Sequence, residues 1–390
     1  MQRPGLVVHS LVLVGIFAVH AASAQSRIVE AAFIEELSIG EDEGADAAYL
    51  LGNPTHVRVD SLGNIYVAEE RQCVVKIFDT DGVLLRALGG RGEGPGEFRE
   101  ISGMVLDEDD RIVILDRFAR RITVFSPDGL VLNTHSFDLD HTIRPKDLIY
   151  LPHRGYAFPG SPVAQGAVES EHFLISIFDS TFNEVRSRAV RATDLYDLEN
   201  PFHLAMLEGG FDLRMNSGPS GELLASPYLY NGKIYVYERR GDEWSGTVVR
   251  GYMPDRESHH VSQPTDAELR QMHAENSVSQ VVNGTYGRFA VRSERHSYGT
   301  FRLNDGHLVH FVHSRLDNKD WRMFVEFFAS DLSFMGRVPL NVDARENGNH
   351  GTGSTRLEVL ELDENGRFYA IGHKSGFPVL HRMRFEYTVE

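Results

Sequence analysis

Three residues of metal-binding type, His56, Asp147 and Asp212, occupy one equivalent position in a repeating pattern of the chain. One imidazole and two carboxylates form a donor set for a divalent ion, Ca²⁺ or Zn²⁺, with positions left open for water. Such an ion would serve a hydrolase or a lyase. The alternative is that these side chains are solvated and line a water-filled channel. We prefer this alternative, so no cofactor is expected and a divalent metal is the second interpretation.

Six polar side chains occupy another equivalent position, just after the second strand expected in each repeat. Their carboxylate, guanidinium, hydroxyl and imidazole groups can hydrogen-bond to a partner. The alternative is that these loop ends are polar simply because they face water. The six residues are Glu70, Arg117, Ser161, Tyr228, His313 and His373.

Familiar catalytic and metal motifs are absent from the sequence or stand in the wrong context. The chain contains no G-x-S-x-G and no H-E-x-x-H. His307, His310 and His313 are spaced like metal ligands. On a strand, however, side chains alternate between the two faces, so these three histidines cannot share one ion without a bulge.

The elements that would position these residues come from an internal repeat. Residues 59–69 (VDSLGNIYVAE) match residues 106–116 (LDEDDRIVILD) at an offset of 47, and the match continues without a gap to Gly82 and Gly129. A period of this length indicates an array of supersecondary units. Within each unit, short runs of Val, Ile, Tyr and Phe are separated by Asp, Gly and Asn turns, which predicts about four strands.

Four looser copies, traced by their first hairpin turn, bring the number of units to six. We therefore predict an all-β fold, a six-bladed β-propeller with four-stranded antiparallel blades. The last unit ends after its third strand, whereas residues 28–40 precede the first unit and have nothing to pair with. We expect this N-terminal segment to join the last blade as its fourth strand, which would close the ring.

The rest of the chain is expected to form a single domain, residues 25–390, with one insertion. Thr265 and Glu268 form a capping-box pattern that predicts a short helix near residues 264–275. This helix would cap one mouth of the ring or act as a lid over a ligand.

Residues 1–24 have the pattern of a secretory signal peptide, with Arg3, an apolar run and Ala22-Ser23-Ala24. The apolar run is shorter than a membrane-spanning helix requires, and no later stretch is long enough. We expect an exported protein, periplasmic or extracellular, with a monomer as the default state. With 56 acidic and 39 basic residues the net charge is −17, which disfavours binding to nucleic acid.

Residues 50–135 resemble the NHL repeat. The resemblance is carried by Gly52-Asn53-Pro54 before a strand, by the pattern from Val59 to Gly82, and by the glycine-rich loop 89–98, which is similar to the inter-blade connection of exported bacterial six-bladed propellers. It implies the propeller fold. It also implies that Glu69 and Asp116 accept backbone N–H bonds from the loop that follows each of them.

Proteins with this type of propeller include lyases, lactonases, receptors and scaffolds, so the resemblance leaves the function open. We predict a non-catalytic protein that presents its loop face to a peptide, a glycan or a protein. The alternative is a metal-dependent hydrolase or lyase, lactonase-like or amidating-lyase-like, that uses His56, Asp147 and Asp212. The zinc of the amidating lyase is held by histidines near the axis, and here only His56 matches them.

Overall fold

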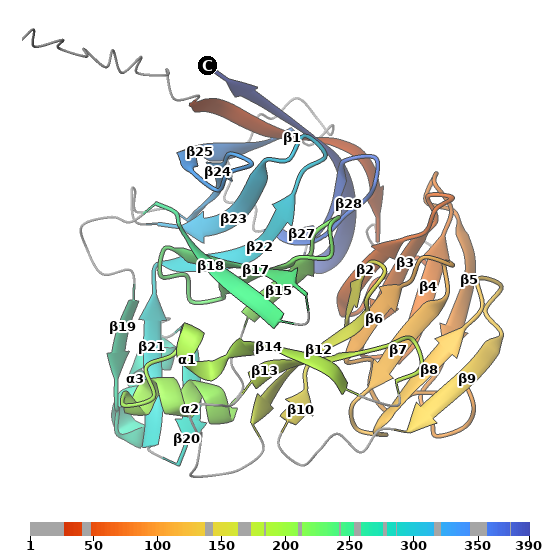
Figure 1. Ribbon diagram of the computed structural model, residues 1–390, viewed down its shortest axis with the longest axis horizontal. Helices are drawn as coiled ribbons and strands as arrows, with labels where there is room; N and C mark the ends of the chain where they lie inside the picture. The colour runs from red at the N-terminus through yellow and green to blue at the C-terminus, as the bar shows by residue number, and fades with distance from the viewer. Residues whose placement is uncertain are drawn as a thin grey trace, which may run out of the picture.

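The computed structural model describes residues 27–40, 48–136, 143–162, 173–182, 185–209, 213–241, 243–252, 259–275, 279–285, 287–315, 321–343, 357–374 and 376–390 (Figure 1). The signal peptide predicted at residues 1–24 lies outside these ranges. Within them the chain is built almost entirely from β-strands, as predicted.

Six blades of at least four strands each form the ring. Blade 1 contains β2 (Pro54–Val59), β3 (Ile65–Glu69), β4 (Val74–Phe78) and β5 (Leu84–Gly89). Blade 2 contains β6 (Gly103–Leu106), β7 (Ile112–Asp116), β8 (Arg121–Phe125) and β9 (Val131–Ser136). Blade 3 contains β11 (Ile149–Leu151), β12 (Gly155–Pro162), β13 (Phe173–Phe178) and β14 (Val185–Arg191), and β10 (Ile143–Pro145) also pairs with β12. Blade 4 contains β15 (Leu213–Ser217), β16 (Leu223–Pro227), β17 (Lys233–Arg240) and β18 (Glu243–Arg250); blade 5 contains β22 (Arg295–Arg302), β23 (Leu308–Ser314), β24 (Arg322–Phe328) and β25 (Phe334–Asp343); and blade 6 contains β26 (Glu358–Leu362), β27 (Arg367–Lys374), β28 (Phe377–Val389) and β1 (Ile28–Ile39).

The innermost strands of the blades form a continuous ring of contacts. Strand β2 contacts β6, and the contacts continue through β11, β15, β22 and β26 back to β2. The second strands are buried on both faces, as the unbroken apolar runs of β3 and β7 predict. Between blades 1 and 2, Tyr66, Ile112 and Phe125 belong to one buried cluster. Each such side chain contributes roughly 1.5–3 kcal/mol on burial.

The first hairpin turn of three blades is fixed by an aspartate. In blade 1, Asp60 accepts hydrogen bonds from the backbone N–H groups of Leu62 and Asn64 and from the Tyr66 hydroxyl. Asp107 and Asp363 accept the equivalent backbone bonds in blades 2 and 6. The side chain therefore imposes the turn locally, which explains why this part of the repeat is the easiest to trace in the sequence.

Strand β1 lies between two blades. It pairs antiparallel with β28, the third strand of blade 6, and parallel with β25, the outer strand of blade 5. Blades 5 and 6 therefore share one eight-stranded sheet. Phe33 of β1 is fully buried against the rings of Phe311, Phe368 and Phe385, with centroid distances of 5.3, 5.4 and 5.3 Å. The pairing with β25 was not predicted from the sequence.

A small additional layer packs beside blades 3 to 5. It consists of α1 (Ala192–Leu195), α2 (Pro201–Gly209), β19 (His259–Ser262), α3 (Asp266–Ala274), β20 (Gln280–Gly284) and β21 (Gly287–Ser293) (Figure 1). Helix α2 contacts β20 and β21. Helix α3 begins with the capping box expected at Thr265 and Glu268, and none of its residues is buried. Helix α2 and the three-stranded sheet were not predicted.

Candidate functional site

Strand directions alternate within each blade, so the turns after the second strands and the connections between blades emerge on one side of the ring, here called the loop face. Glu70 and Arg117 follow β3 and β7, as predicted. Ser161, His313 and His373 instead lie within β12, β23 and β27, because these second strands are longer than those of blades 1 and 2. The side chain of Ser161 is outside the described part of the structure.

Two of the six predicted residues, Tyr228 and His313, belong to one group of stacked rings, here called the aromatic stack: Tyr228, His296, Trp321 and His313. Tyr228 stacks on His296 with 4.8 Å between centroids, and His296 stacks on Trp321 at 5.1 Å. His313 also stacks on Trp321, at 4.7 Å. The two histidines face each other in the pairing of β22 with β23, which is why one indole covers both.

Arginines lie at both ends of the aromatic stack. The guanidinium of Arg214 lies 5.4 Å from the centre of the Tyr228 ring, and that of Arg315 lies 5.4 Å from the Trp321 ring. Arg214 also forms a 2.9 Å ion pair with Glu358 of blade 6, which connects the stack to the ring of inner strands. The two histidines are buried, whereas Tyr228 and Trp321 are partly exposed. The buried histidines and the arginines thus hold the aromatic stack in place, while the rings of Tyr228 and Trp321 remain partly exposed to solvent.

Glu70, Arg117 and His373 do not join this group. Glu70 accepts a hydrogen bond from the Asn53 side chain, and Arg117 forms a 2.8 Å ion pair with Glu100. Each is therefore bound to the connection that precedes its own blade. His373 is exposed near the end of β27. The six positions are equivalent in the repeat, but the five whose side chains the structure describes do not form one continuous surface of contacts.

The carboxylates preceding Glu70 and Arg117 are structural. Glu69 is buried and accepts hydrogen bonds from the backbone N–H groups of Gly52 and Asn53, which precede the blade. The expectation that Glu69 binds the following loop is therefore wrong. Asp116 accepts from the backbone N–H of Arg99 before the blade and from that of Ala119 in the following turn, so the expectation is confirmed there.

Two of the three predicted axial residues meet at the inner ring. The His56 Nε2 atom lies 3.2 Å from Asp147 Oδ1. Burial raises the pKa of Asp147, but the hydrogen bond and charge of His56 and the charge of Arg58 outweigh it, so this pKa lies below its usual value. Asp212 is outside the described residues. In the part of the chain that the structure describes, no three His, Cys, Asp or Glu side chains are grouped to hold a metal ion.

A glycine allows this pair to form across an intervening blade. His56 belongs to blade 1 and Asp147 precedes blade 3, while Gly103 begins the inner strand of blade 2 between them. A Cβ atom at position 103 would lie 2.7 Å from the backbone nitrogen of Leu148. The missing side chain lets the Asp147–Leu148 backbone approach β6 closely.

A second ion pair, Arg58 with Glu361, links blades 1 and 6 at the inner ring with a distance of 3.1 Å. Burial raises the pKa of Glu361 to about 7, although Arg58 acts in the opposite direction. The described inner-ring side chains are therefore largely paired with one another, which favours a structural role for them.

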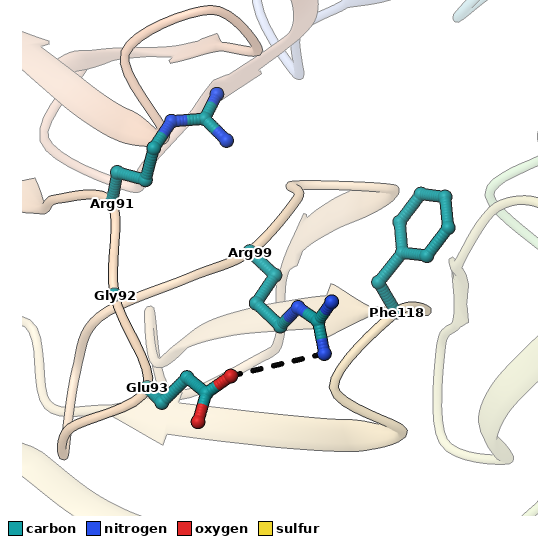
Figure 2. A pocket seen from close by; sticks show the side chains of 5 residues that line it. All are labelled: Arg91, Gly92, Glu93, Arg99 and Phe118. Atoms are coloured by element: carbon teal, nitrogen blue, oxygen red, sulfur yellow. Dashed lines mark ion pairs between the residues drawn. The ribbon is translucent and has the colours of Figure 1, made fainter.

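A pocket of about 430 Å³ opens elsewhere on the loop face, between blades 1 and 2 (Figure 2). Its lining is formed by Arg91, Gly92, Glu93, Arg99 and Phe118, and it is here called the arginine pocket. Phe118 directly follows the predicted residue Arg117, whose guanidinium lies 5.1 Å from the Phe118 ring centre. The predicted position in blade 2 was therefore one residue away from a pocket-lining side chain.

Sequence reasoning missed His296, Trp321 and Arg214 at the aromatic stack. Two positions were compared between repeats, the opening residue of each first strand and the residue after each second strand, and none of these three residues occupies either of them. Trp321 is one of only two tryptophans in the chain. Its place in a loop of blade 5 was the one signal in the sequence that could have marked this site.

Comparison with known proteins supports the fold. Residues 46–194 match the family model DUF5128, described as a 6-bladed beta-propeller. A protein of the duf4221 family from Bacteroides vulgatus has a similar backbone, with a TM-score of 0.55 and 9% identity over 92% of this chain and 99% of that one. A putative exported protein from Bacteroides fragilis gives a TM-score of 0.52 and 12% identity over 94% and 96% of the two chains.

No curated protein matches this sequence. At these identities the structural likeness concerns the fold alone. The internal repeat, the ring of inner strands and the matching family model agree with one another. The chain is a six-bladed β-propeller, similar in fold to two proteins of Bacteroides, one of which is described as a putative exported protein.

Proposed function

We propose that this chain is an exported, non-catalytic propeller that binds a peptide, a glycan or a protein partner on its loop face. The observation that carries the proposal is the aromatic stack, in which the partly exposed Tyr228 and Trp321 stack on two buried histidines. Aromatic side chains and arginines are the residue types enriched at binding surfaces. Because the histidines and arginines already hold the rings of Tyr228 and Trp321 in place, binding of a partner would cost little side-chain entropy.

Export is supported by the signal-peptide pattern and by the likeness to a protein described as exported. None of the helices in the described ranges has both the length and the apolar character needed to cross a membrane.

Trp321 provides a test of binding at the aromatic stack. Trp244, the other tryptophan, lies on the outer strand β18 of blade 4. A Trp244→Phe variant therefore leaves Trp321 as the single tryptophan. We expect a peptide or oligosaccharide that binds to shift its emission in a saturable titration. Tyr228→Ala should weaken this binding about tenfold or more, as removal of a central aromatic contact does.

His373→Ala is the matched control, because His373 occupies the equivalent repeat position in blade 6 but is not part of the aromatic stack. Its affinity should equal that of the parent. If defined peptides and oligosaccharides leave Trp321 emission unchanged, or if Tyr228→Ala binds as well as the parent, the stack is not the binding surface.

The pairing of His56 with Asp147 keeps a metal-dependent hydrolase or lyase as the second candidate. This candidate predicts a stoichiometric Ca²⁺ or Zn²⁺ ion that is lost in Asp147→Ala. The binding proposal predicts that purified protein carries no stoichiometric ion and that Asp147→Ala folds normally. Elemental analysis by mass spectrometry, with circular dichroism of the same samples, distinguishes the two.

A further inference from the structure

We propose that the arginine pocket is a second binding site on the loop face and takes a peptide through one carboxylate and one apolar side chain. The proposal rests on the proposed binding function and names a ligand class for this face. Figure 2 shows Arg91 and Phe118 at opposite ends of the group of lining side chains, with Arg99 between them and Glu93 paired with Arg99. The pocket volume of about 430 Å³ lies in the lower part of the range of small-ligand sites.

The positive charge of the pocket is only weakly compensated. Arg91 donates a 3.2 Å hydrogen bond to the backbone carbonyl of Arg71, which is a neutral acceptor. Arg99 lies 3.8 Å from Glu93, and the side chains are 54% and 79% exposed, so water screens this pair. The carboxylate of Glu97 is directed to the backbone N–H of Gly94. The guanidinium groups of Arg91 and Arg99 can thus bind a carboxylate, because their planar, forked geometry matches its two oxygen atoms.

The loop that carries both arginines is held in place before any ligand binds. Phe98 is fully buried, its N–H donates to the Gly90 carbonyl, and its own carbonyl accepts from the Gly92 N–H. The backbone N–H of Arg99 donates to the buried Asp116 carboxylate at 2.8 Å. Arg121 donates to the backbone carbonyls of Glu93 and Glu97. A ligand would therefore lose little affinity to ordering of this loop.

Phe118 supplies the apolar half of the site. Its side chain is 58% exposed although large and apolar. The guanidinium of Arg117 lies over the ring and is itself fixed by Glu100 at 2.8 Å. One face of the ring is thus occupied, and the rest is open to an apolar group of a ligand.

The charge of the whole chain favours a peptide with one carboxylate over a polyanionic glycan. A net charge of −17 repels a densely charged polymer at long range. A sulfated glycan would also need a row of cations, whereas Arg99 and Arg117 here each have an acidic neighbour. A peptide with one carboxylate and one apolar side chain fits the pocket, because the carboxylate can bind the guanidinium of Arg91 and the apolar side chain can contact the exposed ring of Phe118.

The test uses acetyl-Gly-Phe with a free C-terminal carboxylate, its C-terminal amide, and acetyl-Asp-Phe-amide, each titrated by calorimetry against the folded protein. The free acid should bind, and the amide should bind at least about tenfold more weakly. Binding of the Asp peptide would show that the carboxylate can come from a side chain. Its failure would assign the site to C-terminal carboxylates.

Variants then separate the pocket from general charge effects. Arg91→Gln and Arg99→Gln should each weaken binding of the free acid about tenfold. Glu93→Gln should tighten it, because Arg99 loses its acidic neighbour. The control is Arg240→Gln, another exposed arginine, which lies on blade 4 beside Glu238 and should have no effect.

Three results would overturn the proposal: no measurable binding of either carboxylate peptide, equal binding of acid and amide, or arginine variants that bind like the parent. A sulfated oligosaccharide that binds through Arg91 while the peptides do not would overturn the peptide assignment. Tyr228→Ala should leave peptide binding here unchanged. If the free acid binds through Arg91 while none of the defined peptides and oligosaccharides changes Trp321 emission, the aromatic stack is rejected as a binding surface and the arginine pocket stands.

Discussion

A chain that lacks residues 26–39 is expected to show no cooperative unfolding transition. Strand β1 supplies the fourth strand of blade 6 and covers the outer strand of blade 5, so its removal exposes the edges of both β28 and β25. It also removes the fully buried Phe33 and Ala31. The loss of several core side chains exceeds the stability of about 5–15 kcal/mol that a typical protein has.

The measurement is urea unfolding followed by circular dichroism, compared with a chain that begins at residue 25. Phe33→Ala provides a milder version and should lower the free energy of unfolding by about 3–5 kcal/mol, since four aromatic rings meet there. Val29→Ala, on the same strand but 41% exposed, should change it by less than about 0.5 kcal/mol. A shortened chain that unfolds like the parent would show that β1 is dispensable.

The blades were predictable because their signals are local. The Asp–Gly turn at Asp60 and the apolar strand after it depend on residues within a few positions of one another, and the repeat displays them twice with little change. The parallel pairing of β1 with β25 joins residues about three hundred positions apart. No short pattern encodes it, so it follows only once the ring is assembled.

The candidate site was predictable in part, for the same reason. Aligning the repeats found Tyr228 and His313, because equivalent positions in a propeller lie on one face. It could not show that His313 shares Trp321 with His296, since that depends on a cross-strand register and on the path of a loop. The alternation rule did succeed at the three histidines of blade 5. His310 turns to Ser297, His313 stacks on Trp321, and His307 pairs with Asp305.

Glu326→Ala is expected to lower the free energy of unfolding by about 3–5 kcal/mol. The Glu326 carboxylate is fully buried and lies 3.4 Å from Arg295, whose side chain is 1% exposed. It also accepts a 2.5 Å hydrogen bond from the hydroxyl of Tyr230 and lies 3.3 Å from His310 Nδ1. Removing it leaves the charge of Arg295 buried without its carboxylate.

The network continues from His310 Nε2 to Ser297 Oγ at 2.9 Å and on to Ser226 of blade 4 at 2.6 Å. Ser297, His310 and Glu326 thus have the connectivity of a nucleophile, base and acid relay. All three are completely buried, so no substrate reaches the serine hydroxyl. The role that remains is structural. The network joins blade 4 to blade 5 through directional hydrogen bonds, which fix the relative position of the two blades more strictly than a purely apolar contact would.

A double-mutant cycle tests whether Glu326 and Arg295, which both belong to blade 5, stabilise each other. Arg295→Met and Glu326→Leu should each destabilise the protein in urea unfolding at pH 7. The double variant should be more stable than the sum of the two losses implies, because neither charge is then left buried alone. Glu238→Ala, an exposed carboxylate 4.0 Å from Arg240, should cost less than about 0.5 kcal/mol. Additive losses in the cycle would mean that the two charges do not stabilise each other in the folded protein.

The same carboxylate predicts a pH dependence with a definite sign. Burial raises the pKa of Glu326, but His310, Arg295 and Tyr230 outweigh it and hold this pKa below its usual value of 4.5. A depressed pKa contributes stability above the unfolded value, and that contribution disappears as the pH falls through the folded value. The advantage of the parent over Glu326→Gln should therefore be constant near neutral pH and shrink below pH 4.5. A difference that stays constant down to the acid unfolding of the parent would show that folding does not lower the pKa of Glu326, and a difference that grows as the pH falls would show that this carboxyl is neutral in the folded protein.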